Sequence, residues 1–245
     1  MTPGQWLSVR LGLVKPNFRG DEIPAASGLT FLLLAPVSLA LGAGLPVAVA
    51  SALGVLGFLD DRFGDRSVGG FRGHLKALFS GKPTTGSLKL ALGGLAALAA
   101  AYVHDGFTPG FLIDAPLIAL AANALNLLDL RPGRACFGFA LLAAPSLIVR
   151  PPGVPLWPML GGFLLEWPFD ARARAMLGDT GSNFLGALAG ALAMESLPLW
   201  GRATLLFLLV CLNYAAERVS LSRVISETPW LNWLDRRLGI RNDSP

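Results

Sequence analysis

Eight apolar segments separated by short polar connections dominate this chain and leave it few possible folds. They cover residues 28–44, 46–59, 86–103, 110–129, 135–149, 154–168, 183–197 and 202–219. The chain is 53% hydrophobic and only 15% charged, whereas about a quarter of the residues in soluble domains are charged. Several segments are shorter than the ~20 residues of an ideal membrane helix. We therefore predict an all-α polytopic membrane bundle of about eight transmembrane helices over residues 28–219, within a single domain spanning 1–245.

The basic residues indicate how these helices are oriented. With the N-terminus in the cytoplasm, 17 of the 20 Lys and Arg residues fall in cytoplasmic connections or tails, whereas Arg150 and Arg202 fall on the other side. This is a strong positive-inside pattern. It explains the net charge of +4 without nucleic acid as a partner. It also predicts a multi-pass plasma-membrane protein with both termini in the cytoplasm.

The C-terminal tail carries an amphipathic pattern. Trp230, Trp233, Leu234 and Leu238 recur at spacings of three and four residues, beside several arginines. Such a pattern is typical of a helix lying in the membrane interface. We expect one over residues 226–241, with a disordered tail as the alternative.

Three polar clusters fall on the cytoplasmic side of this arrangement. They are Asp60 with Asp61 after the second segment, Asn123 with Asn126 and Asp129 at the end of the fourth, and residues 178–182 before the seventh. Ionisable residues at such positions are functional candidates by default. Each cluster alone also has a simpler interpretation: a polar loop start, hydrogen bonds between helices, or a helix cap. Their convergence on one side favours a shared site.

Together the clusters predict a site for Mg²⁺ and a diphosphate. Two adjacent carboxylates repel each other and need a cation or water nearby. A glycine-rich turn at a helix N-terminus presents free N–H groups to phosphate, and Asp179 in that turn can hold Mg²⁺. The loop after Asp61 adds basic groups suited to substrate or to lipid headgroups, or to packing of the loop. These are Arg72, His74, Lys76 and Lys82.

At these residues the chain resembles the polyprenyl-phosphate N-acetylhexosamine-1-phosphate transferases of glycosyltransferase family 4. This family includes the phospho-N-acetylmuramoyl-pentapeptide transferase and undecaprenyl-phosphate GlcNAc-1-phosphate transferase, and it serves cell wall and polysaccharide biosynthesis. The resemblance rests on three motifs in the same order, Gly57–Asp65, Asn123–Asp129 and Met176–Ser182. Asn17–Gly28 and Glu217–Ser220 resemble further family segments more loosely.

The resemblance implies an Mg²⁺-dependent enzyme, with Mn²⁺ as the alternative metal. It would transfer an N-acetylhexosamine-1-phosphate, most simply GlcNAc-1-phosphate, from a UDP-sugar to a polyprenyl phosphate such as undecaprenyl phosphate. UMP would leave on the cytoplasmic face. A homodimer is expected only by analogy.

The resemblance also implies roles for individual residues. Asp179 and Asp61 would hold the metal. Asp60 would deprotonate or orient the lipid phosphate, with support from Asp61. Asn126 and Asp129 would face the nucleotide side. Independently of the resemblance, Asn123 and the loop residues Arg72, His74 and Lys76 are further candidates for substrate binding.

The match to the family is incomplete, which keeps other functions open. Where members continue as Asp-Gly-x-Asp-Gly, this chain has Pro132 in place of the second Asp, and Arg131 and Arg134 offer replacement phosphate contacts. The histidine-rich loop of many members is absent, which disfavours a pentapeptide-type substrate, and so is the helix that usually precedes Asn17. The alternatives are a non-catalytic relative acting as scaffold or regulator, a small transporter, and a phosphotransferase acting on CDP-alcohols.

Overall fold

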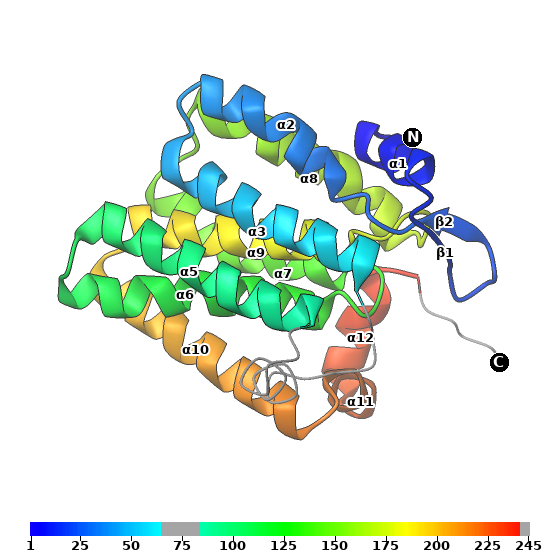
Figure 1. Cartoon of the computed structure of the whole chain (residues 1–245). Coiled ribbons are helices and arrows are strands. Elements are labelled where there is room, and N and C mark those ends of the chain that lie inside the picture. Colours follow the sequence, from blue (N-terminus) through cyan, green and yellow to red (C-terminus); the bar gives the residue numbers. More distant parts are fainter. Residues whose placement is uncertain (65–83, 241–245) are drawn as a thin grey trace.

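The computed structural model describes residues 1–64 and 84–240 of the chain, and within them it is a helix bundle with one short hairpin (Figure 1). The all-α prediction is confirmed. Arg72, His74, Lys76 and Lys82 lie outside the described residues. The elements are α1 (Pro3–Arg10), β1 (Val14–Pro16), β2 (Glu22–Pro24), α2 (Leu29–Ala40), α3 (Gly44–Phe63), α5 (Thr85–Asp105), α6 (Pro109–Leu128), α7 (Arg134–Val149), the 3₁₀ turn η1 (Val154–Leu156), α8 (Trp157–Ala171), α9 (Gly178–Ser196), α10 (Leu199–Arg218), α11 (Leu221–Glu227) and α12 (Pro229–Leu238).

Each of the eight predicted apolar segments corresponds to one helix, namely α2, α3 and α5 to α10. Four of these, α3, α5, α6 and α10, are long and apolar enough to cross a membrane. Helices α2 and α7 are apolar but shorter. Membrane association is therefore supported by the four long helices, and the full count of eight crossings stays a prediction.

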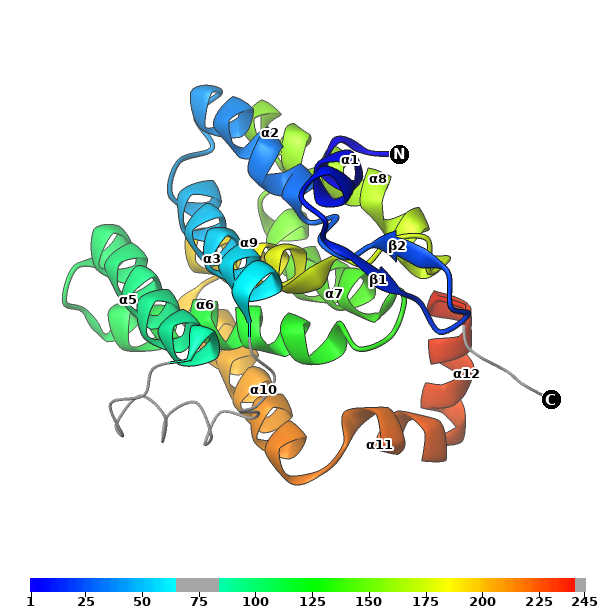
Figure 2. The ribbon, with the colours of Figure 1, turned by 45° about the vertical axis from the view of Figure 1, so that its right-hand side comes forward.

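Helix α9 is the centre of the bundle, and all its residues from Thr180 to Met194 are buried. It packs against α3, α6 and α7, and it runs through the middle of the views in Figures 1 and 2. Small residues allow this close approach: a Cβ on Gly186 would lie 2.4 Å from the Ala121 carbonyl oxygen. Helices with glycine at their contact face pack backbone against backbone in this way.

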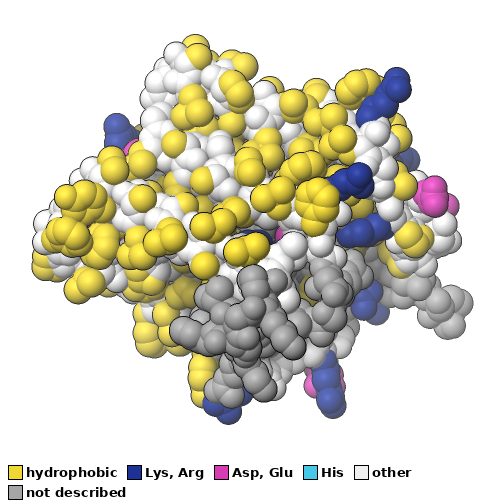
Figure 3. All heavy atoms as spheres, viewed as in Figure 1, with side chains coloured by type: hydrophobic (Ala, Val, Ile, Leu, Met, Phe, Trp, Pro, Cys, Tyr) yellow, Lys and Arg dark blue, Asp and Glu magenta, His cyan; other side chains and the backbone are white. Residues whose placement is uncertain are grey.

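Consecutive helices alternate in direction, so alternate helix ends gather at one end of the bundle. The C-terminal ends of α3, α6 and α10 lie there with the N-terminal ends of α5 and α9 (Figure 1). The hairpin and α12 cover the same end. In Figure 3, hydrophobic side chains cover much of the visible bundle, and most of the visible basic side chains lie toward the end with the hairpin and α12. This surface distribution agrees with the positive-inside pattern of the sequence.

The N-terminal segment folds onto this end, and the short helix α1 precedes Asn17 there, where the sequence predicted no helix. Strands β1 and β2 pair in antiparallel register, with Lys15 opposite Ile23. Helix α1 packs on α2 through a buried polar contact, in which Glu166 of α8 accepts hydrogen bonds from Gln5 Nε2 at 3.0 Å and from Thr30 Oγ1 at 2.5 Å. Because a buried carboxylate needs such donors, this contact fixes α1 beside α2 and α8.

The C-terminal helices α11 and α12 are held against the bundle by a buried ion pair. Arg134 of α7 donates from Nε to Asp235 Oδ1 at 2.6 Å and from Nη2 to Oδ2 at 3.0 Å. Both side chains are buried. The predicted phosphate role of Arg134 therefore does not hold, since its guanidinium is already committed to Asp235.

Helix α12 lies within the range predicted for an interfacial helix, and it crosses the end of the bundle rather than continuing it (Figure 2). Trp230 and Trp233 on it are exposed, and the Arg237 guanidinium lies 4.4 Å from the centroid of the Trp233 ring. Aromatic and basic side chains together suit a membrane interface. Contact of α12 with lipid stays a prediction.

Candidate functional site

The site is built around Lys89, in the second turn of α5. Its ammonium group lies 3.0 Å from Asp60 Oδ2 at the end of α3, and it also forms an ion pair with Asp179 at the start of α9. Three helices thus meet at one cation. All three side chains are partly accessible, at 22% for Lys89, 19% for Asp60 and 30% for Asp179. A small ligand can therefore reach the charges.

Asp61 has a different position from its neighbour Asp60. Its Oδ1 accepts the Asp179 backbone N–H at 3.0 Å, and its Oδ2 accepts the Thr180 backbone N–H at 2.9 Å and the Thr180 hydroxyl at 2.6 Å. The carboxylate thus caps α9 from another helix and interacts favourably with the helix dipole. The phosphate cradle predicted at this N-terminus is consequently filled at these two amides by Asp61.

Two glycines make this contact between α3 and α9 possible. A Cβ on Gly57 would lie 2.1 Å from the Asp179 carbonyl oxygen. Gly178 has a φ of +70°, and a Cβ on it would lie 2.6 Å from Asp61 Oδ2. A left-handed backbone and this close approach both favour glycine. The motifs Gly57–Asp61 and Gly178–Ser182 therefore form one structural unit.

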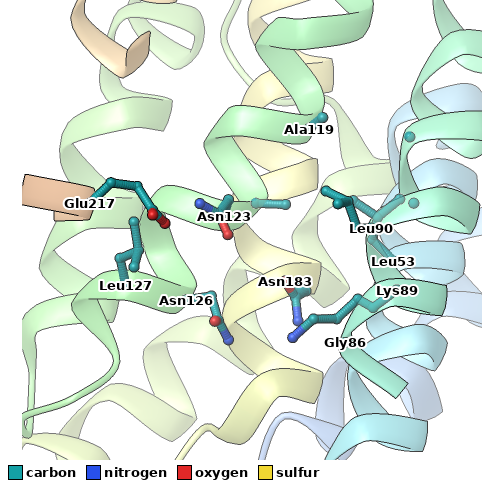
Figure 4. Close-up of a pocket in the computed structure, with 13 residues that line it drawn as sticks. Leu53, Gly86, Lys89, Leu90, Ala119, Asn123, Asn126, Leu127, Asn183 and Glu217 are labelled. Carbon is teal, nitrogen blue, oxygen red and sulfur yellow. The ribbon is translucent and has the colours of Figure 1, made fainter. Parts of the chain in front are cut away.

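Lys89 also lines a cavity of about 190 Å³ between α5, α6, α9 and α10 (Figure 4). Its other polar lining residues are Asn123, Asn126, Asn183 and Glu217. Leucines and small residues complete the wall, including Leu53 and Gly93. The cavity wall thus combines polar and apolar side chains, a combination typical of binding sites for amphipathic ligands.

The two predicted asparagines of α6 line this cavity while also linking helices. Asn123 donates to Asn213 Oδ1 of α10 at 2.6 Å, and Asn126 donates to Ser182 Oγ of α9 at 3.2 Å. Asn183 is held by a bond from its Nδ2 to the Asp179 carbonyl at 2.7 Å. Hydrogen bonding between helices, the simpler interpretation of Asn123 and Asn126, is therefore observed together with their position on the cavity wall.

Asp129, predicted on the nucleotide side, lines a separate hollow with Pro132, Asp170 and Asn17. Burial raises the pKa of its carboxyl well above the ordinary range, and the neighbouring carboxylates of Asp170, Asp179 and Asp61 raise it further. Like charges in a partly desolvated place disfavour ionisation. The Asp129 carboxyl thus interacts electrostatically with Asp61 and Asp179. It does not line the cavity that contains Asn123 and Asn126.

The donors present suit Mg²⁺, because carboxylate oxygens are the ligands that this ion prefers. Asp60 and Asp179 point their carboxylates at a shared cation position, which the Lys89 ammonium holds here. Asp61 stands directly beside them, but its oxygens are engaged with α9. Asp179 and Asp60 are thus better placed than Asp61 to hold a metal.

Two residues of this site, Lys89 and Asn183, were not predicted from the sequence, and Glu217 was noted only as part of a segment that resembles the family loosely. A lysine inside an apolar helix was a usable signal, because ionisable residues in membrane helices are costly and commonly functional. No protein-family model matches the chain, and no curated protein matches it. The assignment of a function therefore depends on the geometry of the site.

Proposed function

We propose that this chain transfers a sugar-1-phosphate, best assigned as GlcNAc-1-phosphate, from a UDP-sugar to a polyprenyl phosphate and releases UMP. The observation that carries this proposal is the meeting of Asp60, Lys89 and Asp179 beside a cavity whose wall carries both polar and apolar side chains. A reaction between a lipid phosphate and a nucleotide diphosphate needs both environments in one place. The ordered motifs of the sequence support the same function.

In the proposed reaction, an oxygen of the lipid phosphate attacks the β-phosphorus of the UDP-sugar. The bond from that phosphorus to the bridging oxygen breaks, and UMP leaves with the electron pair. Asp60 accepts the remaining proton of the lipid phosphate or orients it. Lys89 offers three N–H donors to the phosphate oxygens, on which negative charge is concentrated. The chemistry demands mainly alignment and neutralisation of two anions.

Asp179 and Asp60 are the residues that would hold Mg²⁺, or Mn²⁺ as the alternative. When bound, the metal supplies neutralisation of the diphosphate charge. Asn123, Asn126 and Asn183 would donate hydrogen bonds to the nucleotide part of the donor from the cavity wall. Glu217 lies on the same wall, at the end of α10.

The proposal places the protein in the plasma membrane, crossed by eight helices, with both termini and the site on the cytoplasmic face. Seventeen basic residues on that side support this orientation. Helix α12 would lie in the interface. A homodimer is part of the proposal only through the family resemblance.

The experiment is a transfer assay with the purified full chain in detergent, undecaprenyl phosphate, Mg²⁺ and a panel of UDP-sugars. UMP release and the lipid-linked product are both followed. Transfer from one donor, lost in Asp179→Asn and retained in the exposed control Glu22→Gln, supports the proposal. A folded protein that transfers from no donor overturns it.

A second candidate is a non-catalytic relative that acts as a scaffold or regulator. One observation favours it: Lys89 pairs with both Asp60 and Asp179, and Asp61 accepts hydrogen bonds from α9, so each of these carboxylates has a partner without a metal. In that case UDP-sugar and Mg²⁺ would leave the thermal unfolding temperature unchanged. A ligand-dependent rise in this temperature would favour the transferase.

A further inference from the structure

A second polar cluster lies at the opposite end of the bundle, and the proposed reaction does not use it. It consists of His104 and Asp105 at the C-terminal end of α5, Asp114 in the second turn of α6, and Arg202 in the first turn of α10. The site around Lys89 lies near the other end of the same helix α5. The cluster therefore needs an explanation of its own.

Arg202 engages one oxygen of each carboxylate in this cluster. Its Nη1 donates to Asp114 Oδ2 at 2.5 Å and to Asp105 Oδ2 at 3.1 Å. Oδ1 of each carboxylate receives no hydrogen bond from Arg202. Asp105 Oδ1 lies 3.6 Å from His104 Nε2. Asp114 Oδ1 is buried and accepts no hydrogen bond from any of the described residues.

This arrangement is electrostatically incomplete. One guanidinium faces two carboxylates, and the Asp114 side chain is 0% exposed. A buried carboxylate oxygen without a donor destabilises the fold, because it has lost its hydrogen bonds to water without replacement. A cation placed opposite Arg202 would remove both deficits, since it would bind the oxygens that Arg202 leaves free.

Ligand atoms of the histidine and the two aspartates also lie close together. One ligand atom from each of His104, Asp105 and Asp114 can be chosen so that all three lie within 4.8 Å of one another. The backbone is adapted to the cluster, because a Cβ on Gly110 would lie 1.9 Å from Asp105 Oδ2. Only a glycine at this position lets the Asp105 carboxylate approach the start of α6 so closely.

We propose that His104, Asp105 and Asp114 bind a divalent transition metal, with Zn²⁺ as the best-fitting ion. One imidazole nitrogen and two carboxylate oxygens suit Zn²⁺, and a water completes its tetrahedral coordination. Mg²⁺ prefers ligands that are all oxygen, which separates this site from the one around Asp179. Arg202 serves as a positioning residue that orients both carboxylates, as outer partners of metal ligands commonly do.

Such a metal would fasten α10 to the bundle. Within α10, Leu209 is the only buried residue, and partly buried leucines such as Leu205 and Leu212 provide the rest of its apolar packing. Arg202 connects its first turn to the two ligand carboxylates on α5 and α6. Zn²⁺ bound there is expected to stabilise the contact between α10 and α6 without touching the Lys89 site.

The test is Zn²⁺ titration of the purified full chain in detergent, in competition with a chromogenic chelator. We expect one equivalent to bind. His104→Ala and Asp114→Asn each remove a direct ligand and should weaken binding by more than the about 10–100-fold that loss of an outer partner costs. The chain has two histidines, so His74→Ala is a matched control that should bind as the wild type does. Asp179→Asn should also retain binding, because it alters the other end.

Thermal unfolding provides a second measurement that does not depend on enzymatic activity. Zn²⁺ should raise the unfolding temperature of the wild type and of His74→Ala, and leave that of His104→Ala unchanged. Failure of the wild type to bind Zn²⁺ overturns the proposal and assigns Asp114 Oδ1 to a proton or a water. Loss of binding in His74→Ala but not in His104→Ala overturns it as well.

Discussion

The Lys89 ammonium on α5 lies 3.0 Å from the Asp60 carboxylate on α3, near one end of an apolar bundle. The same ammonium pairs with Asp179 on α9. Charged groups inside such a bundle are costly and persist where they are paired. Because Lys89 also lines the adjoining cavity, this pairing connects the stability of the site to its proposed chemistry.

Replacement of Lys89 tests the centre of the site. Lys89→Met removes the cation shared by two carboxylates and the donor facing the cavity. We expect the turnover number for sugar-phosphate transfer to fall about 100-fold or more, as losses of transition-state electrostatic stabilisation do. Lys15→Met in the hairpin is the control and should keep wild-type turnover. Equal effects of the two variants would exclude a specific role for Lys89.

The two carboxylates paired with Lys89 should fail in different ways. Asp179→Asn should abolish metal-dependent transfer while the protein stays folded in membranes. Asp60→Asn should lower turnover far more than it lowers nucleotide binding, because Asp60 is proposed to act on the lipid phosphate in addition to sharing the metal with Asp179. Activity at saturating Mg²⁺ in Asp179→Asn would refute the metal assignment. Lost nucleotide binding with normal residual turnover in Asp60→Asn would refute the base assignment.

Asp61 should matter for stability as well as for activity. Asp61→Ala removes three hydrogen bonds to the first turn of α9. Charge-assisted bonds contribute about 1.5–3 kcal/mol each, and they are not additive. We therefore expect a loss of at least ~2 kcal/mol in the free energy of unfolding in detergent. Asp60→Ala should lower the free energy of unfolding by less, because Lys89 keeps Asp179 as a partner. A larger loss for Asp60→Ala than for Asp61→Ala would contradict the capping role of Asp61.

The helices of the bundle could be predicted from sequence, because each apolar segment is a local property of the chain. The polar motifs also came together as expected where they belong to helix ends, as with Asp60 and Asp179. Asn123 and Asn126 reached the cavity because they share one face of α6. These successes depend on periodicity and on the alternation of helix direction, both of which are readable from sequence.

The rest depends on contacts that are distant in sequence. Lys89 joins the site only because α5 packs beside α3 and α9. Asp61 turns to α9 because Gly57 and Gly178 let the two backbones approach. Arg134 is taken by Asp235, which lies 101 residues later. No local pattern shows which of several charged side chains will pair after folding.

The Arg134–Asp235 pair makes a prediction about the C-terminal helices. Breaking a buried ion pair from one side costs about 3–5 kcal/mol, because the other charge stays buried. Asp235→Ala should therefore release α11 and α12, seen as faster proteolysis after Arg218 and faster amide exchange in α12. Arg134→Lys should not rescue the contact, since lysine cannot form the bidentate pair. Unchanged exchange in Asp235→Ala would show that other contacts hold α12.

Asp129 gives a prediction about pH. Burial and the carboxylates of Asp170, Asp179 and Asp61 raise its pKa in the folded protein above that of the unfolded chain. The raised pKa of Asp129 therefore costs stability at neutral pH. This penalty begins to shrink as the pH falls through the raised folded-state pKa and is gone below the unfolded-state pKa. Asp129→Asn should raise the unfolding temperature at pH 7.5 in the presence of EDTA.

The advantage of Asp129→Asn should shrink as the pH is lowered toward the unfolded-state pKa of about 3.9, because the wild-type carboxyl is then protonated in the fold as well. Glu22→Gln on the exposed hairpin is the control and should give a difference from wild type that is small at every pH. The measurement is the unfolding temperature of wild type, Asp129→Asn and Glu22→Gln in detergent across this pH range. If Asp129→Asn unfolded at a lower temperature than wild type at pH 7.5, the ionised carboxylate would have a stabilising partner in the fold. That partner would then offset the repulsion from the neighbouring carboxylates.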